Sequence, residues 1–169
     1  LALGSGRVSS LIRAVSFQGM ALGAMPFLLS HEFSPWVTLV AIATMVGKGW
    51  VIPLLLGRAM RAAHIEREID PLIGFVPSLL LGAGGTIAAI ALARSLPLRP
   101  EHAGTLLVPG AVASILTGFI LLIGRNKALS QVCGYLILEN GIYLFGLLLI
   151  HATALLVEAG ILLDVTVGV

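Results

Sequence analysis

The chain has 169 residues, of which 58% are hydrophobic and 11% are charged, and its formal net charge is +2. A soluble domain of this length carries far more polar residues, so the composition predicts that the chain lies in lipid. The small net charge, and a sequence without a basic run interleaved with aromatic residues, argue against a nucleic-acid partner. A single cysteine, Cys133, excludes an internal disulfide and a cysteine-based metal cluster.

The hydrophobic residues are grouped into segments separated by short connections, none of them large enough to form a soluble domain. A helix of about 20 apolar residues crosses the hydrocarbon core of a bilayer. We therefore predict an all-α, polytopic transmembrane helix bundle in which residues 1–169 form one domain. The chain starts at Leu1 and stops within an apolar run at Val169, so we expect further residues at one or both ends. The six predicted spans are residues 8–29, 34–57, 71–93, 104–124, 128–150 and 152–169.

Basic residues are divided unequally between the two sides of this predicted bundle. The side richer in Lys and Arg is expected to be cytoplasmic, and it includes the loops at 58–70 and 124–128. The six-to-two division also supports the count of six spans, because one missed span would scramble it. One side holds Arg7, Arg58, Arg61, Arg67, Arg125 and Lys127, and the other holds Arg94 and Arg99.

The second predicted span carries a lysine, Lys48, near mid-membrane. Glycines flank it at positions 47 and 49, and Pro53, which has no N–H, leaves the carbonyl of Gly49 without its helical donor. A lysine beside such a softened turn can be partly solvated, and a buried amine can gain and lose a proton. Two interpretations stay open, a proton carrier or the static partner of a buried carboxylate. The carboxylate could belong to this chain or to a neighbouring subunit.

The fifth predicted span carries an acid, Glu139, about halfway across the bilayer. A charged side chain at that depth costs about 2.5–3.5 kcal/mol on insertion scales. Gln131, Tyr135 and Glu139 are spaced by four residues, so they form a polar stripe along one helix face. Lipid cannot satisfy these polar groups, and we expect the stripe to face protein or a water-filled cavity.

The sixth predicted span adds two further acids, Glu158 and Asp164. They are about 120° apart around the helix, so they cannot both face the same neighbour. His151 shares a face with Glu158 but stands at the outer edge of the span. It is either an interfacial residue or a group through which protons enter or leave.

Lys48, Glu139, Glu158 and Asp164 together point to proton movement rather than to chemistry on a substrate. Ionisable residues inside a bilayer mark ion pathways and proton relays. The sequence contains no pattern typical of a hydrolytic triad, a phosphate cradle or a metal site. We therefore expect a membrane subunit that is not itself an enzyme, with lipid as its surroundings. We rank Glu139 first in such a relay, then Glu158 and Lys48, with Asp164 last.

Three segments also resemble a known family. GRNKALSQVCGYLILENG, the following LVEAGILLDVTVGV and the earlier KGWVIPLLL are similar to component E of the hydrogenase-4 and formate hydrogenlyase type of membrane-bound nickel–iron hydrogenase. The resemblance covers nearly the whole chain and is most specific in the ENG and E-x-G-x-x-x-D segments. It implies an additional helix before Arg7 and a place in a prokaryotic cytoplasmic (inner) membrane.

The resemblance implies a subunit of a complex I-like, energy-converting hydrogenase that translocates protons. The nickel–iron (NiFe) centre and the iron–sulfur clusters are then expected in peripheral partner subunits, with antiporter-like subunits as membrane neighbours. No cofactor is expected in this chain. Gln131, Tyr135, Pro53 and His151 would support the relay residues.

The second half also looks like the K-type subunit of complex I and the C-type subunit of multisubunit sodium/proton antiporters. Glu158 matches the second membrane acid of those subunits, but Leu136 occupies the place of the first, and Glu139 comes three residues later. Three alternatives therefore stay open. They are a structural spacer in the same complex, a stand-alone cation/proton antiporter, and a subunit of complex I or of a sodium/proton antiporter, which has about three spans.

Overall fold

The computed structural model describes residues 2–4, 7–29, 35–64, 71–95 and 105–149, and every regular element in these ranges is a helix. The predicted all-α class is therefore confirmed. The predicted span 152–169 lies outside the described residues, and with it His151, Glu158 and Asp164. The elements are α1 (Val8–Leu29), α2 (Pro35–Val46), a π-helical turn η1 (Gly47–Val51), α3 (Ile52–Ala62), α4 (Phe75–Ser95), α5 (Leu107–Gly124) and α6 (Ala128–Leu149).

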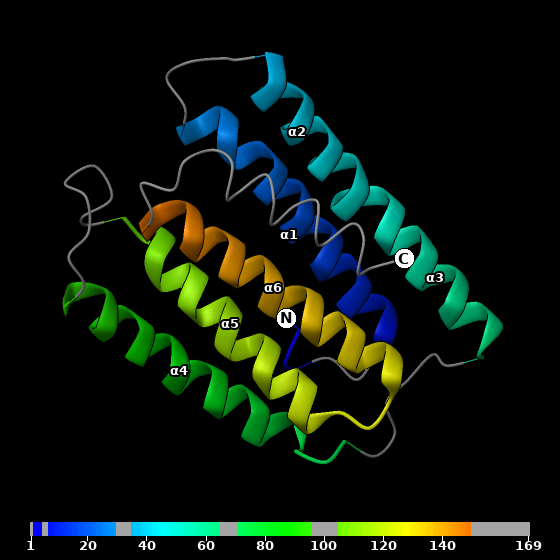
Figure 1. Ribbon diagram of the computed structural model, residues 1–169. Helices are drawn as coiled ribbons and strands as arrows, with labels where there is room; N and C mark the ends of the chain where they lie inside the picture. The colour runs from blue at the N-terminus through cyan, green and yellow to red at the C-terminus, as the bar shows by residue number, and fades with distance from the viewer. Residues whose placement is uncertain (1, 5–6, 30–34, 65–70, 96–104, 150–169) are drawn as a thin grey trace.

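The helices stand side by side in one row (Figure 1). Their order in space is α4, α5, α6, α1 and then α2–η1–α3, which runs without a break from Pro35 to Ala62. The helix α6 therefore lies between α5 and α1, although α1 and α6 are far apart in the sequence. The main apolar core fills this centre, and Val8, Leu121 and Cys133 are its most deeply buried members.

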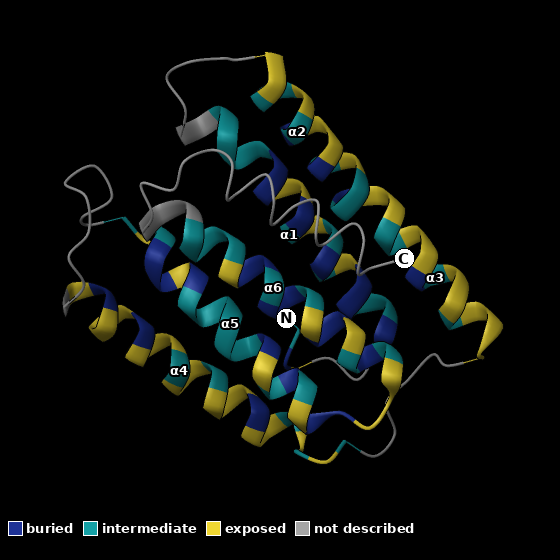
Figure 2. Cartoon of the chain, viewed as in Figure 1, coloured by how far each residue is buried: buried dark blue, intermediate teal, exposed yellow. Residues whose placement is uncertain are grey.

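The outer helices carry many exposed residues, as Figure 2 shows along α2–α3 and α4, and large apolar side chains are among them. Trp50 is 67% exposed and Leu80 is 69% exposed. Contiguous apolar surface of this kind is rare on soluble proteins, whereas lipid solvates it without cost. The exterior therefore fits a bilayer, in agreement with the composition.

The number of predicted spans was too high for what the structure supports. Among the described residues, three helices are long and apolar enough to cross a membrane: Pro35–Ala62, Phe75–Arg94 and Leu107–Gly124. Helices α1 and α6 have the length, 22 residues each. They are not among these three helices.

Close contact between α5 and α6 depends on glycine. A Cβ atom at Gly141 of α6 would lie 2.7 Å from the backbone nitrogen of Ile115 and 2.9 Å from the carbonyl oxygen of Ala111. Gly134, two turns earlier on the same face, meets the side chain of Leu121 in the same way. Small residues at such positions let two membrane helices approach backbone to backbone. This contact fixes the rotation of α6 and therefore the direction of its polar residues.

Several described cations gather at one end of the row. Arg7 precedes α1, Arg58 and Arg61 are in α3 near its end, and Arg125 and Lys127 connect α5 to α6 (Figure 1).

Arg125 differs from the others, because its side chain is 1% exposed. Its Nη2 donates to the carbonyl of Leu3 at 2.8 Å, and the guanidinium lies 4.5 Å from the ring centroid of Phe75. The sequence treated Arg125 as one charge of a basic loop, whereas the structure shows that it joins three segments.

Candidate functional site

The candidate site begins at the π-helical turn η1, in the middle of the helix that runs from Pro35 to Ala62. The N–H of Ile52 donates to the carbonyl of Gly47, five residues earlier, which makes the turn one residue wider than an α-helical turn. Pro53 follows directly and cannot donate a backbone hydrogen bond. The segment in which the sequence predicted a softened turn is therefore π-helical, and Lys48 lies within it.

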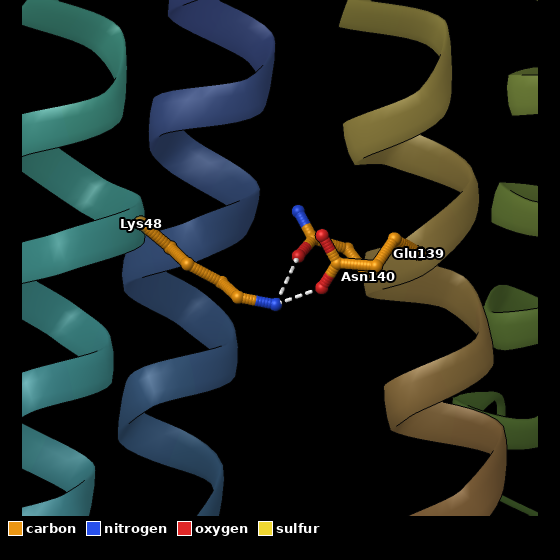
Figure 3. Close-up of polar contacts among 3 residues, drawn as sticks. All are labelled: Lys48, Glu139 and Asn140. Atoms are coloured by element: carbon orange, nitrogen blue, oxygen red, sulfur yellow. Dashed lines mark hydrogen bonds and ion pairs between the residues drawn. The ribbon is translucent and has the colours of Figure 1, made fainter. Parts of the chain in front are cut away.

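Lys48 forms an ion pair with Glu139 of α6. Its Nζ contacts Glu139 Oε1 directly and lies 3.4 Å from Oδ1 of Asn140 (Figure 3). The side chains of Lys48 and Glu139 are 12% and 15% exposed, and Asn140 is 2% exposed. The question that the sequence left open is answered here, because the partner of Lys48 belongs to the same chain.

Tyr143 completes the surroundings of the amine. Its ring centroid lies 5.5 Å from Lys48 Nζ, within the range of a cation–π interaction. Tyr143 is one helical turn after Glu139, and Asn140 is the next residue after Glu139. The sequence reasoning missed both, although the four-residue spacing from Glu139 to Tyr143 could have indicated the tyrosine.

The lysine reaches α6 across α1, which separates the two helices. Gly19 of α1 makes this possible, because a Cβ atom there would lie 2.7 Å from the carbonyl oxygen of Lys48 and 2.9 Å from its Cβ. On the same side of α1, the hydroxyl of Ser16 donates to the carbonyl of Gly49 at 2.5 Å. The sequence predicted that this carbonyl would help to solvate Lys48. The structure instead gives it a donor from α1.

Two residues of the predicted polar stripe do not join this site. Gln131 Nε2 donates to the carbonyl of Arg125 at 2.9 Å, so the side chain closes the start of α6. Tyr135 is 47% exposed. Around the axis of α6, Tyr135 is rotated about 40° and Gln131 about 80° from Glu139. Asn140 and Tyr143 are rotated from Glu139 in the opposite direction, so Tyr135 and Gln131 face away from the site.

Other polar groups lie near the ion pair in the inner part of the row. Gln18 of α1 donates to the hydroxyl of Ser114 of α5 at 3.1 Å. Thr44 of α2, one turn before Lys48, is 6% exposed, and its hydroxyl has no hydrogen-bond partner among the described residues. Within the same ranges, no group of three or more His, Cys, Asp and Glu side chains could hold a metal ion.

The arrangement is suited to proton exchange. An ammonium and a carboxylate in direct contact can pass one proton between them and become two neutral groups, so the pair exists in two forms of equal net charge. Asn140 offers its amide oxygen to the amine in either form. Glu139 is the only acidic side chain in the described part of the chain, so its proton has no other described carboxylate to reach.

The chain is similar in sequence to a mycobacterial protein. It is 35% identical over 162 residues to the uncharacterized protein Rv0085 of Mycobacterium tuberculosis, and the alignment covers 95% of this chain and 74% of that protein. The chain belongs to the same family as this mycobacterial protein. No family profile and no solved structure matches the chain. The name of the relative assigns no activity, so the resemblance to hydrogenase component E stays a prediction.

Proposed function

We propose that this chain, a member of the same family as the mycobacterial protein, is a proton-relaying subunit of a larger membrane complex. Lys48 and Glu139 exchange a proton near the middle of the bilayer. Glu158 and then Asp164, which lie outside the described residues, extend the relay. The chain itself carries out no chemistry on a substrate.

One observation carries the proposal, the direct contact of Lys48, near the middle of the apolar Pro35–Ala62 helix, with Glu139, near the middle of the 22-residue helix α6. A fixed brace between helices needs no charge at this depth, because apolar side chains of similar volume are as stable or more stable. Charged groups that persist inside a bilayer usually serve ion or proton movement. Two glycines and a proline around Lys48 also leave its turn less rigid than an α-helical turn.

In this proposal α1 and α6 cross the bilayer together with the three apolar helices. Each is about 33 Å long at 1.5 Å per residue, which matches a hydrocarbon core of about 30 Å. Glu139 and Asn140 of α6 face the inside of the row, where Lys48 meets them, rather than lipid. The end of the row that carries Arg7, Arg58 and Lys127 is then the cytoplasmic end.

The complex that we propose is a complex I-like nickel–iron hydrogenase of a prokaryotic inner membrane. The support is the resemblance of the KGWVIPLLL and GRNKALSQVCGYLILENG segments to hydrogenase component E. The nickel–iron centre and iron–sulfur clusters belong to peripheral partner subunits, and antiporter-like subunits are the neighbours in the membrane. Identification of the chains that co-purify tests this part, and a complex without a nickel-binding subunit would contradict it.

The role of the pair is tested by Glu139→Gln in the assembled complex, reconstituted into lipid vesicles. We expect that the complex still assembles and still forms hydrogen, but that proton translocation is lost. Gln131→Leu in the same helix is the matched control, because Gln131 bonds to the Arg125 carbonyl and not to the pair. This variant should translocate protons like the wild type.

Two other outcomes would favour the alternatives. Unchanged proton translocation in Glu139→Gln would contradict the relay and favour a structural spacer. Cation or proton transport by the isolated chain in vesicles would favour a stand-alone antiporter, since the proposed subunit depends on partners for its driving force.

A further inference from the structure

A serine of α1 holds the turn that carries Lys48. Pro53 has no N–H to give to the carbonyl of Gly49, and the Ser16 hydroxyl donates to that carbonyl at 2.5 Å. Gly49 follows Lys48 directly in the chain and is buried. The hydrogen bond therefore fixes η1 against α1 at the position next to the lysine.

The π-helical turn determines the direction in which Lys48 points. Each residue of an α-helix turns the chain by about 100°, so the extra residue of η1 changes the rotation of α2 relative to α3. With this turn in place, Leu56 of α3 and Ala41 of α2 are both buried. If η1 relaxed to an α-helix while α3 stayed packed, Lys48 would rotate away from α6 and lose Glu139.

Gly19 supports the same placement independently. It lies one turn after Ser16 on α1, and a Cβ atom there would collide with the backbone and Cβ of Lys48, at 2.7–2.9 Å. The next glycine along this face, Gly23, meets Met45 of α2 in the same manner, with contacts of 2.7–2.8 Å. The helix α1 thus allows η1 to come close enough for the lysine side chain to pass across it.

We propose that Ser16 and Gly19 form a positioning site on α1 that holds the π-helical turn in the register in which Lys48 contacts Glu139. Ser16 acts through the Gly49 carbonyl, to which its hydroxyl donates. The importance of this site for proton transfer rests on the proposed function, whereas its effect on the ion pair does not.

The test measures whether Glu139 is paired, by its reaction with dicyclohexylcarbodiimide in purified protein reconstituted in lipid. This hydrophobic reagent modifies protonated carboxyl groups, and a carboxylate held by an ammonium is protected. Mass spectrometry of the labelled peptide gives the rate at Glu139. Lys48→Met removes the ammonium and should raise that rate about tenfold or more, because one pKa unit is a tenfold change in the protonated fraction.

Ser16→Ala is expected to raise the rate toward that of Lys48→Met, whereas Ser16→Thr, which keeps a hydroxyl, should react like the wild type. Gly19→Ala should act like Ser16→Ala. The matched control is Ser114→Ala, which removes another hydroxyl from the inner part of the row but leaves η1 untouched.

The results test two claims separately, the positioning site on α1 and the ion pair of Lys48 with Glu139. A wild-type rate in both Ser16→Ala and Gly19→Ala, with a raised rate in Lys48→Met, overturns the positioning site and leaves the pair intact. A wild-type rate in Lys48→Met means that the lysine does not hold the carboxylate, which removes the basis of the proposed function itself. An equal rise in Ser114→Ala would show that any loss of a partly buried hydroxyl loosens the bundle, and it would also overturn the positioning site.

Discussion

Removal of one member of the ion pair should cost more stability than removal of both. Glu139→Gln removes the carboxylate that contacts the ammonium of Lys48, which is 12% exposed and lies near the middle of the Pro35–Ala62 helix. A charge at that depth costs about 2.5–3.5 kcal/mol, and release of the proton from the lysine limits the loss to this range or below it. Lys48→Met leaves the carboxylate in the corresponding position and should cost a similar amount.

The double variant Lys48→Met with Glu139→Leu carries neither charge. Replacement of a buried ion pair by apolar residues of similar volume is often neutral or stabilising, so we expect a stability within about 1 kcal/mol of the wild type or above it. Proton translocation should nevertheless stay lost in the double variant. Normal stability without proton translocation in the double variant would indicate a relay. If the ion pair only braced the helices, the double variant should recover proton translocation together with stability.

The chain contains its own reporter for this experiment. Cys133 is the single cysteine, and it is 0% exposed in the core between α1, α5 and α6. A fluorogenic thiol reagent reacts with it only after the bundle opens, so its reaction during heating reports unfolding in lipid or detergent. The reasoning is refuted if both single variants unfold like the wild type, or if the double variant loses the sum of the two single losses.

Three further predictions concern contacts around the site. Gly141→Ala should destabilise the α5–α6 contact by about 1–3 kcal/mol in the same thiol assay. Gly146→Ala, with no atom of the described residues within 4 Å of its Cβ position, should be neutral or stabilising, and equal effects of the two substitutions would contradict the close approach. Arg125→Lys should cost about 1–2 kcal/mol of stability, because the hydrogen bond to the Leu3 carbonyl and the contact with the Phe75 ring are lost. A similar loss of stability in Arg58→Lys, at an exposed position, would exclude a special role for Arg125. Tyr143→Leu should raise carbodiimide labelling of the acid while Tyr143→Phe keeps the ring and the wild-type rate, and an effect in both variants would assign the role to the hydroxyl.

Much of the site could be predicted from residue types alone. Lys48 and Glu139 stand out because a charge in an apolar helix is costly, and the Gly-Lys-Gly segment before Pro53 indicates a weakened turn. The sequence could not show that they meet, because this depends on the order of helices in space and on a glycine, Gly19, that lets one helix pass close to another.

The sequence extended the polar face of α6 from Glu139 toward the wrong end of the helix. A stripe through Gln131 and Tyr135 extends toward the start of the helix, whereas Asn140 and Tyr143 extend it toward the end. Four-residue spacing alone does not distinguish these directions, because both are about 40° from Glu139. The rotation of α6 is set by its glycine contacts with α5, which depend on a second helix and not on the local pattern.

The structural role of Arg125 could not be predicted from the sequence either. A basic residue in a short connection between apolar segments predicts a solvated charge at the membrane surface. Its burial comes from Leu3 and Phe75, which are distant in the chain. The predicted count of six spans was also too high, since three helices among the described residues have the length and hydropathy of a membrane span.

The contact between Lys48 and Glu139 in a bilayer is the claim on which this account depends most directly. The chain has two lysines, Lys48 and Lys127, so solid-state NMR of isotope-labelled protein in lipid can assign each amine nitrogen. The account predicts a through-space correlation between the Lys48 amine nitrogen and a glutamate carboxyl carbon that disappears in Glu139→Gln. A Lys48 signal that correlates with water alone, or that keeps its carboxyl partner in Glu139→Gln, would contradict it.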